Sequence, residues 1–189
     1  MPWFCPPRRG VLPLDRIHVS RSLARTLRRS GFETTLDAAF EAVVAGCREP
    51  RAYESGTWIS DDLAAAYVRL HRLGYAHSAE VWDGERLVGG IYGVQIGGVF
   101  CGESMFHRVT DASKVALADL AARLNEARAG LLEIQHATPH LRSLGAIEIA
   151  REVYLRLLEE LRDDEVRLLR DRLPVRRLAA PGALDIRWE

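Results

Sequence analysis

The stretch that decides the fold reads YAHSAEVW (75–82), DG (83–84), RLVGGIYGV (86–94), GG (97–98) and VFCGESMF (99–106). The first segment alternates between polar and apolar residues, which is typical of a strand. Asp83-Gly84 is a strong signal for a tight hairpin turn, and Gly97-Gly98 is a second one. The stretch therefore predicts three consecutive antiparallel strands that form a meander.

Helical patterns lie on both sides of the predicted meander. Ser20 and Ser60 stand where helix N-caps are expected, and Gly74 and Gly130 stand where glycine ends a helix. The expected helices cover residues 21–29, 37–45, 61–73, 113–129 and 151 to about 173, and a short buried strand covers 131–135. This order predicts an α+β domain over residues 20–173, after an extended N-terminal segment (1–19) and before a loose C-terminal tail (174–189).

Composition and charge exclude several classes of protein. The chain has 189 residues, 48% of them hydrophobic, with 26 basic and 26 acidic residues. These values are typical of globular proteins and exclude a disordered or collagen-like chain. The apolar run 87–100 is broken by glycines and is too short to span a bilayer, and residues 1–7 lack the pattern of a secretory signal. Three widely separated cysteines favour a reducing compartment, so we expect a cytoplasmic protein without a membrane partner.

Arginine supplies 25 of the 26 basic residues. Its planar guanidinium suits phosphate contacts, although a GC-rich genome would produce the same bias. Residues 1–30 contain seven arginines and one acid, and a second arginine group lies at 170–177. Since Arg21, Arg25, Arg28 and Arg29 fall at helical spacings, they are the candidate contacts to a nucleic-acid backbone.

Three polar side chains interrupt apolar strands. Glu103 lies within FCGESMF (100–106), where alternation places Phe100, Gly102, Ser104 and Phe106 on the opposite face. Glu133 and Gln135 share one face of the strand 131–135, so their side chains can converge on one ligand. The alternatives are a buried salt bridge for Glu103 and an exposed sheet edge for Glu133 and Gln135.

Other catalytic patterns are poorly supported. His136 and His140 are four residues apart, but Pro139 prevents a regular helix between them, and no Cys-x-x-Cys pair is present. We therefore expect no metal site. The nucleophile motif Gly-x-Ser-x-Gly and a phosphate-binding loop ending in Gly-Lys are also missing. Trp58, just before a predicted helix, could stack on a nucleobase or anchor the core.

Seven segments in a fixed order resemble the leucyl/phenylalanyl-tRNA–protein transferases, from about Trp3 to Leu158. The strongest signals are FCGESMF and the Gly-Gly-x-Tyr-Gly pattern. The segments are HVSRS (18–22), GTWI (56–59), AYVRLHRLGYAHS (66–78), LVGGIYG (87–93), FCGESMF (100–106), ASK (112–114) and SLGA (143–146).

The resemblance implies a GNAT-like (acetyltransferase-like) domain and an aminoacyl transfer reaction. The donor would be leucyl-, phenylalanyl- or methionyl-tRNA, and the acceptor would be the α-amino group of a protein that starts with Arg or Lys. The product would be a destabilising N-terminus in the N-degron pathway. No cofactor is expected, and we expect a monomer. Relative to the family, residues 1–19 would correspond to the end of an N-terminal domain that is otherwise missing from this chain.

The resemblance also assigns roles to individual residues. Gln135 would orient the reacting groups, and Glu133, where the family usually has Asp, would stand behind it as the proton-accepting partner. Glu103 would recognise the cationic N-terminal residue or hold the adenosine. The substrate-binding residues would be Trp58 and Tyr67 at the terminal adenine, Trp3 as a second stacking partner, and Ile91 and Phe100 around the aminoacyl side chain.

Three other functions stay open from the sequence. The acceptor could be another amine, such as a small molecule or a peptide. An acyl-CoA N-acyltransferase would want a glycine-rich loop before the helix at 113, where the chain reads HRVTDAS (107–113). A non-catalytic tRNA-binding module would not need Glu133 and Gln135.

Overall fold

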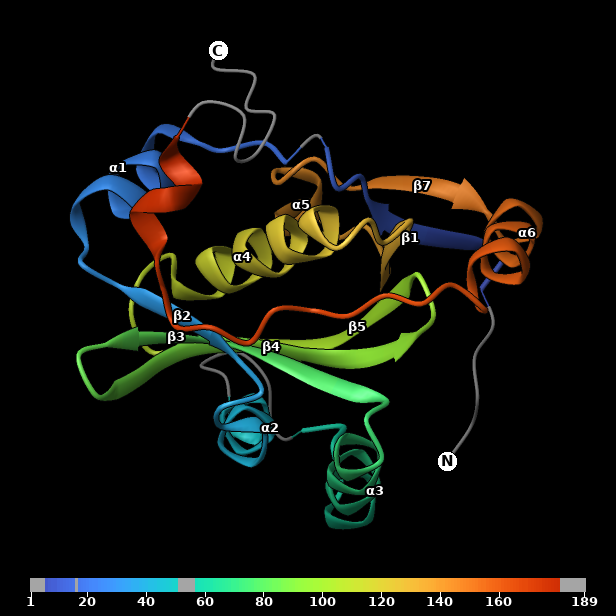
Figure 1. The fold of residues 1–189 in the computed structure, drawn as a ribbon, viewed down its shortest axis with the longest axis horizontal. Helices are drawn as coiled ribbons and strands as arrows, with labels where there is room; N and C mark the ends of the chain where they lie inside the picture. The colour runs from blue at the N-terminus through green and yellow to red at the C-terminus, as the bar shows by residue number, and fades with distance from the viewer. Residues whose placement is uncertain (1–5, 16, 51–56, 181–189) are drawn as a thin grey trace.

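The computed structural model describes residues 6–15, 17–50 and 57–180, and it shows one curled eight-stranded sheet with helices on both faces (Figure 1). The strand order is β7-β1-β6-β5-β4-β3-β2-β8. All neighbouring pairs are antiparallel except β5 and β6, which are parallel. The α+β prediction is therefore confirmed, with a mixed sheet.

The described residues form the following elements. The strands are β1 (Arg8–Leu12), β2 (Glu33–Leu36), β3 (Ala76–Asp83), β4 (Arg86–Ile96), β5 (Val99–His107), β6 (Leu131–Gln135), β7 (Ile147–Ala150) and β8 (Leu173–Pro174). The helices are α1 (Arg21–Arg29), α2 (Phe40–Arg48), α3 (Asp61–Arg72), α4 (Ala112–Glu126), α5 (Pro139–Arg142) and α6 (Arg151–Leu161), followed by a 3-10 helix, η1 (Val175–Ala179). None of the helices in these residues is long and apolar enough to cross a membrane.

The predicted meander is confirmed as β3, β4 and β5. The predicted caps of α1 and α3 are also confirmed, since the Ser20 and Ser60 side chains each accept a hydrogen bond from the backbone N–H three residues later. Gly74 follows α3 with a φ of 82°, a left-handed conformation that glycine adopts without strain. Strong local signals thus produced the elements that they predicted.

Two apolar clusters cover opposite faces of the meander. The larger one joins α4 and α1 to the sheet and contains Phe100 and Leu120. The smaller one joins α2 and α3 to the other face and contains Tyr92 and Phe106. Figure 1 shows the same arrangement, with α2 and α3 below the sheet and α4 above it.

A β-bulge at Glu103 separates residues that alternation assigned to one face. Tyr92 of β4 pairs with Ser104, whereas Gly93 pairs with Gly102, so Glu103 has no partner on β4. The extra residue shifts the alternation by one. Phe100 and Phe106 therefore lie in opposite clusters, and the prediction that they share a face was wrong.

The C-terminal part differs most from the sequence prediction. The helix expected from residue 151 to about 173 ends at Leu161, and after a turn at 162–163 the chain runs without regular structure across the sheet to residue 172 (Figure 1). Arg123 of α4, whose side chain is fully buried, donates to the carbonyl oxygens of Leu169 and Asp171 at 2.6 and 2.9 Å. These contacts hold this segment against α4.

Residues 173–179, expected in a loose tail, pack against the body of the protein. Leu173–Pro174 pair with β2, and Val175 and Leu178 are buried. Arg177 contacts Asp119 of α4 at 2.7 Å, and Thr34 of β2 donates to the same carboxylate. A buried acid on α4 therefore fixes both β2 and η1.

The remaining differences are smaller. Helix α2 begins at Phe40 rather than residue 37 and continues through Gly46. Helix α4 ends at Glu126, before the expected residue 129. Pro139 begins the short helix α5 in the segment expected as a loop, and β7 has no sequence prediction.

Glu80 is a fully buried carboxyl group in β3. The Thr35 and Ser78 hydroxyls donate to its two oxygens at 2.5 Å, and Trp82 Nε1 donates to the Thr35 hydroxyl at 2.8 Å. Burial raises the pKa of Glu80 from 4.5 to about 7, although these hydrogen bonds oppose the shift.

The free energy of unfolding should therefore fall as pH rises from about 4.5 to 7, because the folded state binds the Glu80 proton more tightly than the unfolded state does. One pKa unit corresponds to about 1.4 kcal/mol, so the full effect is about 3 kcal/mol. Denaturant unfolding of the wild type and of Glu80→Gln at several pH values measures it. Glu85→Gln, at an exposed site on the same hairpin, is the control. If the stability of Glu80→Gln follows the same pH curve as that of the wild type, the raised pKa is refuted.

Candidate active site

Gln135, at the end of β6, connects three chain segments. Its φ is 61°, in the left-handed region that non-glycine residues rarely adopt. Its backbone N–H donates to Glu133 Oε1 at 2.6 Å, and its side-chain Nε2 donates to Glu103 Oε2 at 2.9 Å. The structure thus brings together the three polar residues that the sequence singled out.

Glu103 occupies the bulge of β5 and is half-buried. Burial raises the pKa of its carboxyl group, while hydrogen bonds from Tyr67 and Gln135 and the charge of Arg9 oppose the shift. Tyr67 of α3 is 9% exposed, and burial followed by the Glu103 charge raises the pKa of its hydroxyl. Its hydroxyl therefore stays protonated and serves as a donor to Glu103.

Glu133 lies in the interior of the sheet and is fully buried. Arg9 of β1 contacts its Oε1 at 2.8 Å, and Oε2 has no hydrogen-bond partner among the described residues. Burial raises the pKa of Glu133, and the Arg9 charge and the Gln135 N–H oppose the rise. Glu133 thus contacts the backbone of Gln135 rather than its side chain.

Sequence reasoning missed Arg9 and Tyr92. Arg9 was counted only among the N-terminal arginines, because its pairing with β6 and β7 is not local. Tyr92 lies in the Gly-Gly-x-Tyr-Gly pattern, which was a usable signal. Its ring contacts that of Tyr67 edge-on with centroids 5.0 Å apart, and its buried hydroxyl has no partner among the described residues.

The other predicted substrate-binding residues lie in different parts of the structure, and they differ in how exposed they are. Ile91 is buried in the larger cluster, and its Cδ1 lies near Gly102 of β5. Phe100 is fully buried in the larger cluster, and Trp58 is 48% exposed before α3. Trp3 lies outside the described residues.

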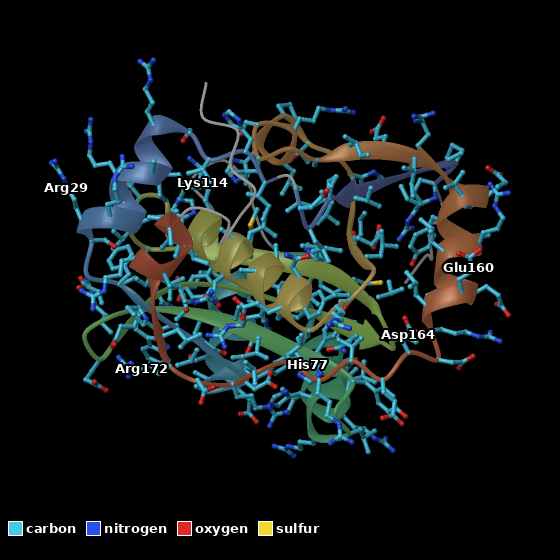
Figure 2. The ribbon with its side chains drawn as sticks, turned by 45° about the horizontal axis from the view of Figure 1, so that its top comes forward. Arg29, His77, Lys114, Glu160, Asp164 and Arg172 are labelled. Atoms are coloured by element: carbon cyan, nitrogen blue, oxygen red, sulfur yellow. The ribbon has the colours of Figure 1, made fainter. Side chains whose placement is uncertain are left out.

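The four candidate arginines of α1 are exposed, while Leu23, Ala24 and Leu27 of the same helix are buried. Figure 2 shows Arg29 pointing away from the body of the protein. Of the second arginine group, Arg170, Arg172 and Arg177 form ion pairs with Asp37, Glu33 and Asp119, respectively.

Within residues 6–15, 17–50 and 57–180, no group of three or more His, Cys, Asp or Glu side chains is arranged to hold a metal ion. The site instead offers an amide side chain that is held by the Glu103 carboxylate, with Glu133 on the backbone of the same residue and the Tyr67 hydroxyl on Glu103. Such an arrangement can orient an amine and a carbonyl group and can hold a cation.

Comparison with known proteins gives the family. The family model described as "Leucyl/phenylalanyl-tRNA protein transferase" matches residues 11–159, which include the whole Gln135 site except Arg9. The chain belongs to this family. The resemblance found in the sequence is therefore confirmed.

Similar proteins with this name occur in several bacteria. One from Novosphingobium aromaticivorans is 54% identical over 158 residues, which are 84% of this chain and 60% of that protein. One from Shewanella halifaxensis is 50% identical over 164 residues, 87% of this chain and 70% of that protein. One from Zymomonas mobilis is 54% identical over 157 residues, 83% of this chain and 59% of that protein. This family member thus spans about 60 to 70% of the length of the curated relatives.

Replacing Tyr67 with Phe should raise the pKa of Glu103 further, because the variant loses a hydroxyl that donates to the carboxylate. The side-chain carboxyl of Glu103, followed by NMR during a pH titration, measures the shift. Tyr75→Phe is the matched control, since Tyr75 is 54% exposed and lies outside the site. An unchanged Glu103 titration in Tyr67→Phe would show that the hydrogen bond has no energetic role.

Proposed function

We propose that the chain transfers leucine, phenylalanine or methionine from aminoacyl-tRNA to the α-amino group of proteins that begin with Arg or Lys. Membership of the leucyl/phenylalanyl-tRNA–protein transferase family supports the reaction class. The observation that carries the proposal is the fixed amide of Gln135, held through Nε2 by Glu103 and through its backbone by Glu133.

The reaction suits a site of this kind because an aminoacyl ester is already activated. The ammonium first loses a proton to solvent. The amine nitrogen then attacks the ester carbon, the bond from that carbon to the ribose oxygen breaks, and the second amine proton passes to that oxygen by way of the Glu133 carboxylate. Positioning and proton acceptance can supply the rate, without a metal ion or a nucleophilic side chain.

The hydrogen bond to Glu103 decides which way the Gln135 amide points. An ionised carboxylate only accepts hydrogen bonds, so it binds the NH2 group and leaves the Gln135 carbonyl oxygen for another donor. We assign that oxygen to the attacking amine. Glu133, whose Oε2 has no hydrogen-bond partner among the described residues, is the proton acceptor that we propose. Glu103, whose charge is only partly compensated by neighbours, would attract the cationic N-terminal residue of the acceptor.

The remaining roles follow the family resemblance. Trp58, with 48% of its surface exposed, has a face available for the terminal adenine, and Tyr67 would lie beside it. Ile91 would form the wall of the aminoacyl pocket and Phe100 its buried floor, so that apolar side chains fit and charged ones are rejected. Trp3 would add a second stacking face. We propose a GNAT-like fold, a cytoplasmic location and a role in the N-degron pathway on the same basis.

One feature of α4 favours aminoacyl transfer over an acyl-CoA reaction. Asp111 precedes α4 with a φ of 66°, and its carboxylate accepts hydrogen bonds from Ser22 and Lys114 at 2.9 and 2.7 Å. A buried acid at this helix N-terminus opposes the binding of a pyrophosphate group there.

The test is to incubate the chain with labelled leucyl-tRNA and a peptide that begins with Arg, and to compare the wild type with Gln135→Ala. We expect wild-type transfer and a loss of about 100-fold or more in kcat for the variant, with little change in leucyl-tRNA affinity. Asn125→Ala, which also replaces an amide side chain with alanine but at an exposed position of α4, should transfer normally. Equal kcat in wild type and Gln135→Ala would end the assignment of Gln135.

A second prediction concerns tRNA binding by Arg21, Arg25, Arg28 and Arg29. Replacing Arg25 and Arg28 together with Gln should weaken binding of all leucyl-tRNA isoacceptors similarly, because phosphate contacts carry no sequence information. The salt dependence of binding should flatten by about one unit of slope per lost contact. Binding titrations at several salt concentrations measure this, with Arg156→Gln/Arg167→Gln as a control on other exposed surfaces. An unchanged slope would mean that these arginines form only a solvated helix face.

A further inference from the structure

We propose that Arg9 is a positioning residue for Gln135, and that it acts through the charge of the Glu133 carboxylate. This inference rests on the proposed function for its kinetic part, because it concerns the same site. No substrate contact is assigned to Arg9 itself.

Strand β1 brings Arg9 to the site. Strand β1 lies between β6 and β7, and Gly10 pairs with Gln135 on one side and with Glu148 on the other. An ideal Cβ on Gly10 would lie 2.6 Å from the backbone nitrogen of Ala137, so only glycine permits this approach. Arg9 is thereby held next to Gly10, the β1 residue that pairs with Gln135.

The Arg9 side chain is mostly buried and contacts Glu133 and Tyr154. It is 15% exposed, its guanidinium lies over the Tyr154 ring at 4.9 Å, and one of its terminal nitrogens contacts Glu133 Oε1 at 2.8 Å. Arg9 Nε and Glu133 Oε2 have no hydrogen-bond partners among the described residues. The pair is therefore joined at a single point, and Arg9 acts on Glu133 chiefly by its charge.

The charge of the Arg9–Glu133 pair is linked to Gln135 through one shared oxygen atom. The same Glu133 oxygen that contacts Arg9 accepts the Gln135 N–H at 2.6 Å. A hydrogen bond to an ionised acceptor is about twice as strong as one to a neutral acceptor. Because Gln135 has a left-handed φ of 61°, its backbone needs such a contact to persist. If Glu133 becomes protonated, the contact weakens and the Gln135 amide loses its fixed position.

The groups that face Glu133 come from three elements besides its own. Arg9 of β1 favours the ionised form of Glu133, whereas the charge of Glu103 on β5 disfavours it. The Glu133 charge in turn raises the pKa of Cys101 on β5 and of Tyr154 on α6. Burial raises the pKa of the Cys101 thiol to about 12, so at neutral pH this side chain is uncharged. Of the charged groups that face Glu133, Arg9 is thus the cation and Glu103 the anion.

Replacing Arg9 with Met should raise the pKa of Glu133, and the acid-side loss of kcat should begin at a higher pH than in the wild type. Because the variant lacks the neighbouring cation, kcat on the acid side of the profile should be lower than in the wild type at the same pH. Leucyl-tRNA affinity should stay within about twofold. Arg9→Lys keeps the charge and should stay close to the wild-type pH profile. Arg8→Met is the control, because the Arg8 side chain is 61% exposed and pairs with Glu148 at the surface.

The double variant Arg9→Met/Glu133→Gln separates positioning from ordinary structural pairing, and it carries the test if Arg9→Met does not fold. It replaces the ion pair by neutral groups, and the Gln oxygen at position 133 can still accept the Gln135 N–H. Because position 133 can no longer titrate, we expect the kcat of the double variant to be low and to lack the acid-side loss that Glu133 causes in the wild type and in Arg9→Met. A double variant that keeps this acid-side loss at the same pH would overturn the inference.

An NMR titration without tRNA distinguishes failure of this inference from failure of the proposed function. In the wild type the backbone amide resonance of Gln135 should shift over the same pH range in which Glu133 titrates. This range should move to higher pH in Arg9→Met and should stay in place in Arg9→Lys. If the wild type transfers no leucine but the titrations behave in this way, the proposed function alone fails. If the Gln135 amide does not respond to Glu133, the inference about Arg9 is overturned.

Discussion

The hydrogen bond from the Gln135 backbone to Glu133 Oε1, 2.6 Å long, holds the last residue of β6 in a left-handed conformation. This turn of the backbone directs the Gln135 side chain to Glu103 on β5 rather than along the strand. Glu103 in turn is held by Tyr67 from α3. One short contact therefore determines how three elements present their polar groups at a common point.

Two irregularities in the sheet make this arrangement possible. The bulge at Glu103 places a carboxylate outside the regular pairing of β4 and β5. A second shift in register, where Gly10 pairs with Gln135 and Val11 pairs with Glu133, leaves Ile134 without a partner on β1. Bulges commonly re-aim side chains beside active sites. A regular sheet with the same sequence would place these side chains on fixed, alternating faces.

Local signals in the sequence sufficed for much of the fold and for the core of the site. The turns at Asp83-Gly84 and Gly97-Gly98 predicted the meander, and the polar residues in apolar strands identified Glu103, Glu133 and Gln135. The missing parts depend on contacts between residues far apart in the chain. Arg9 reaches Glu133 only because β1 inserts between β6 and β7, and the buried Arg123 holds the segment after α6 through the carbonyls of Leu169 and Asp171. Periodicity within a segment does not contain such information.

The central claim is that the amide of Gln135 contacts the reacting groups. A crystal structure of the chain with a leucyl-adenosine analogue, in which an amide replaces the reactive ester, tests it most directly. The account predicts that the leucyl carbonyl or amine lies within hydrogen-bond distance of the Gln135 side chain, with the leucyl side chain beside Ile91. A bound analogue that makes no contact with Gln135, with Glu103 and Gln135 still paired to each other, would contradict it.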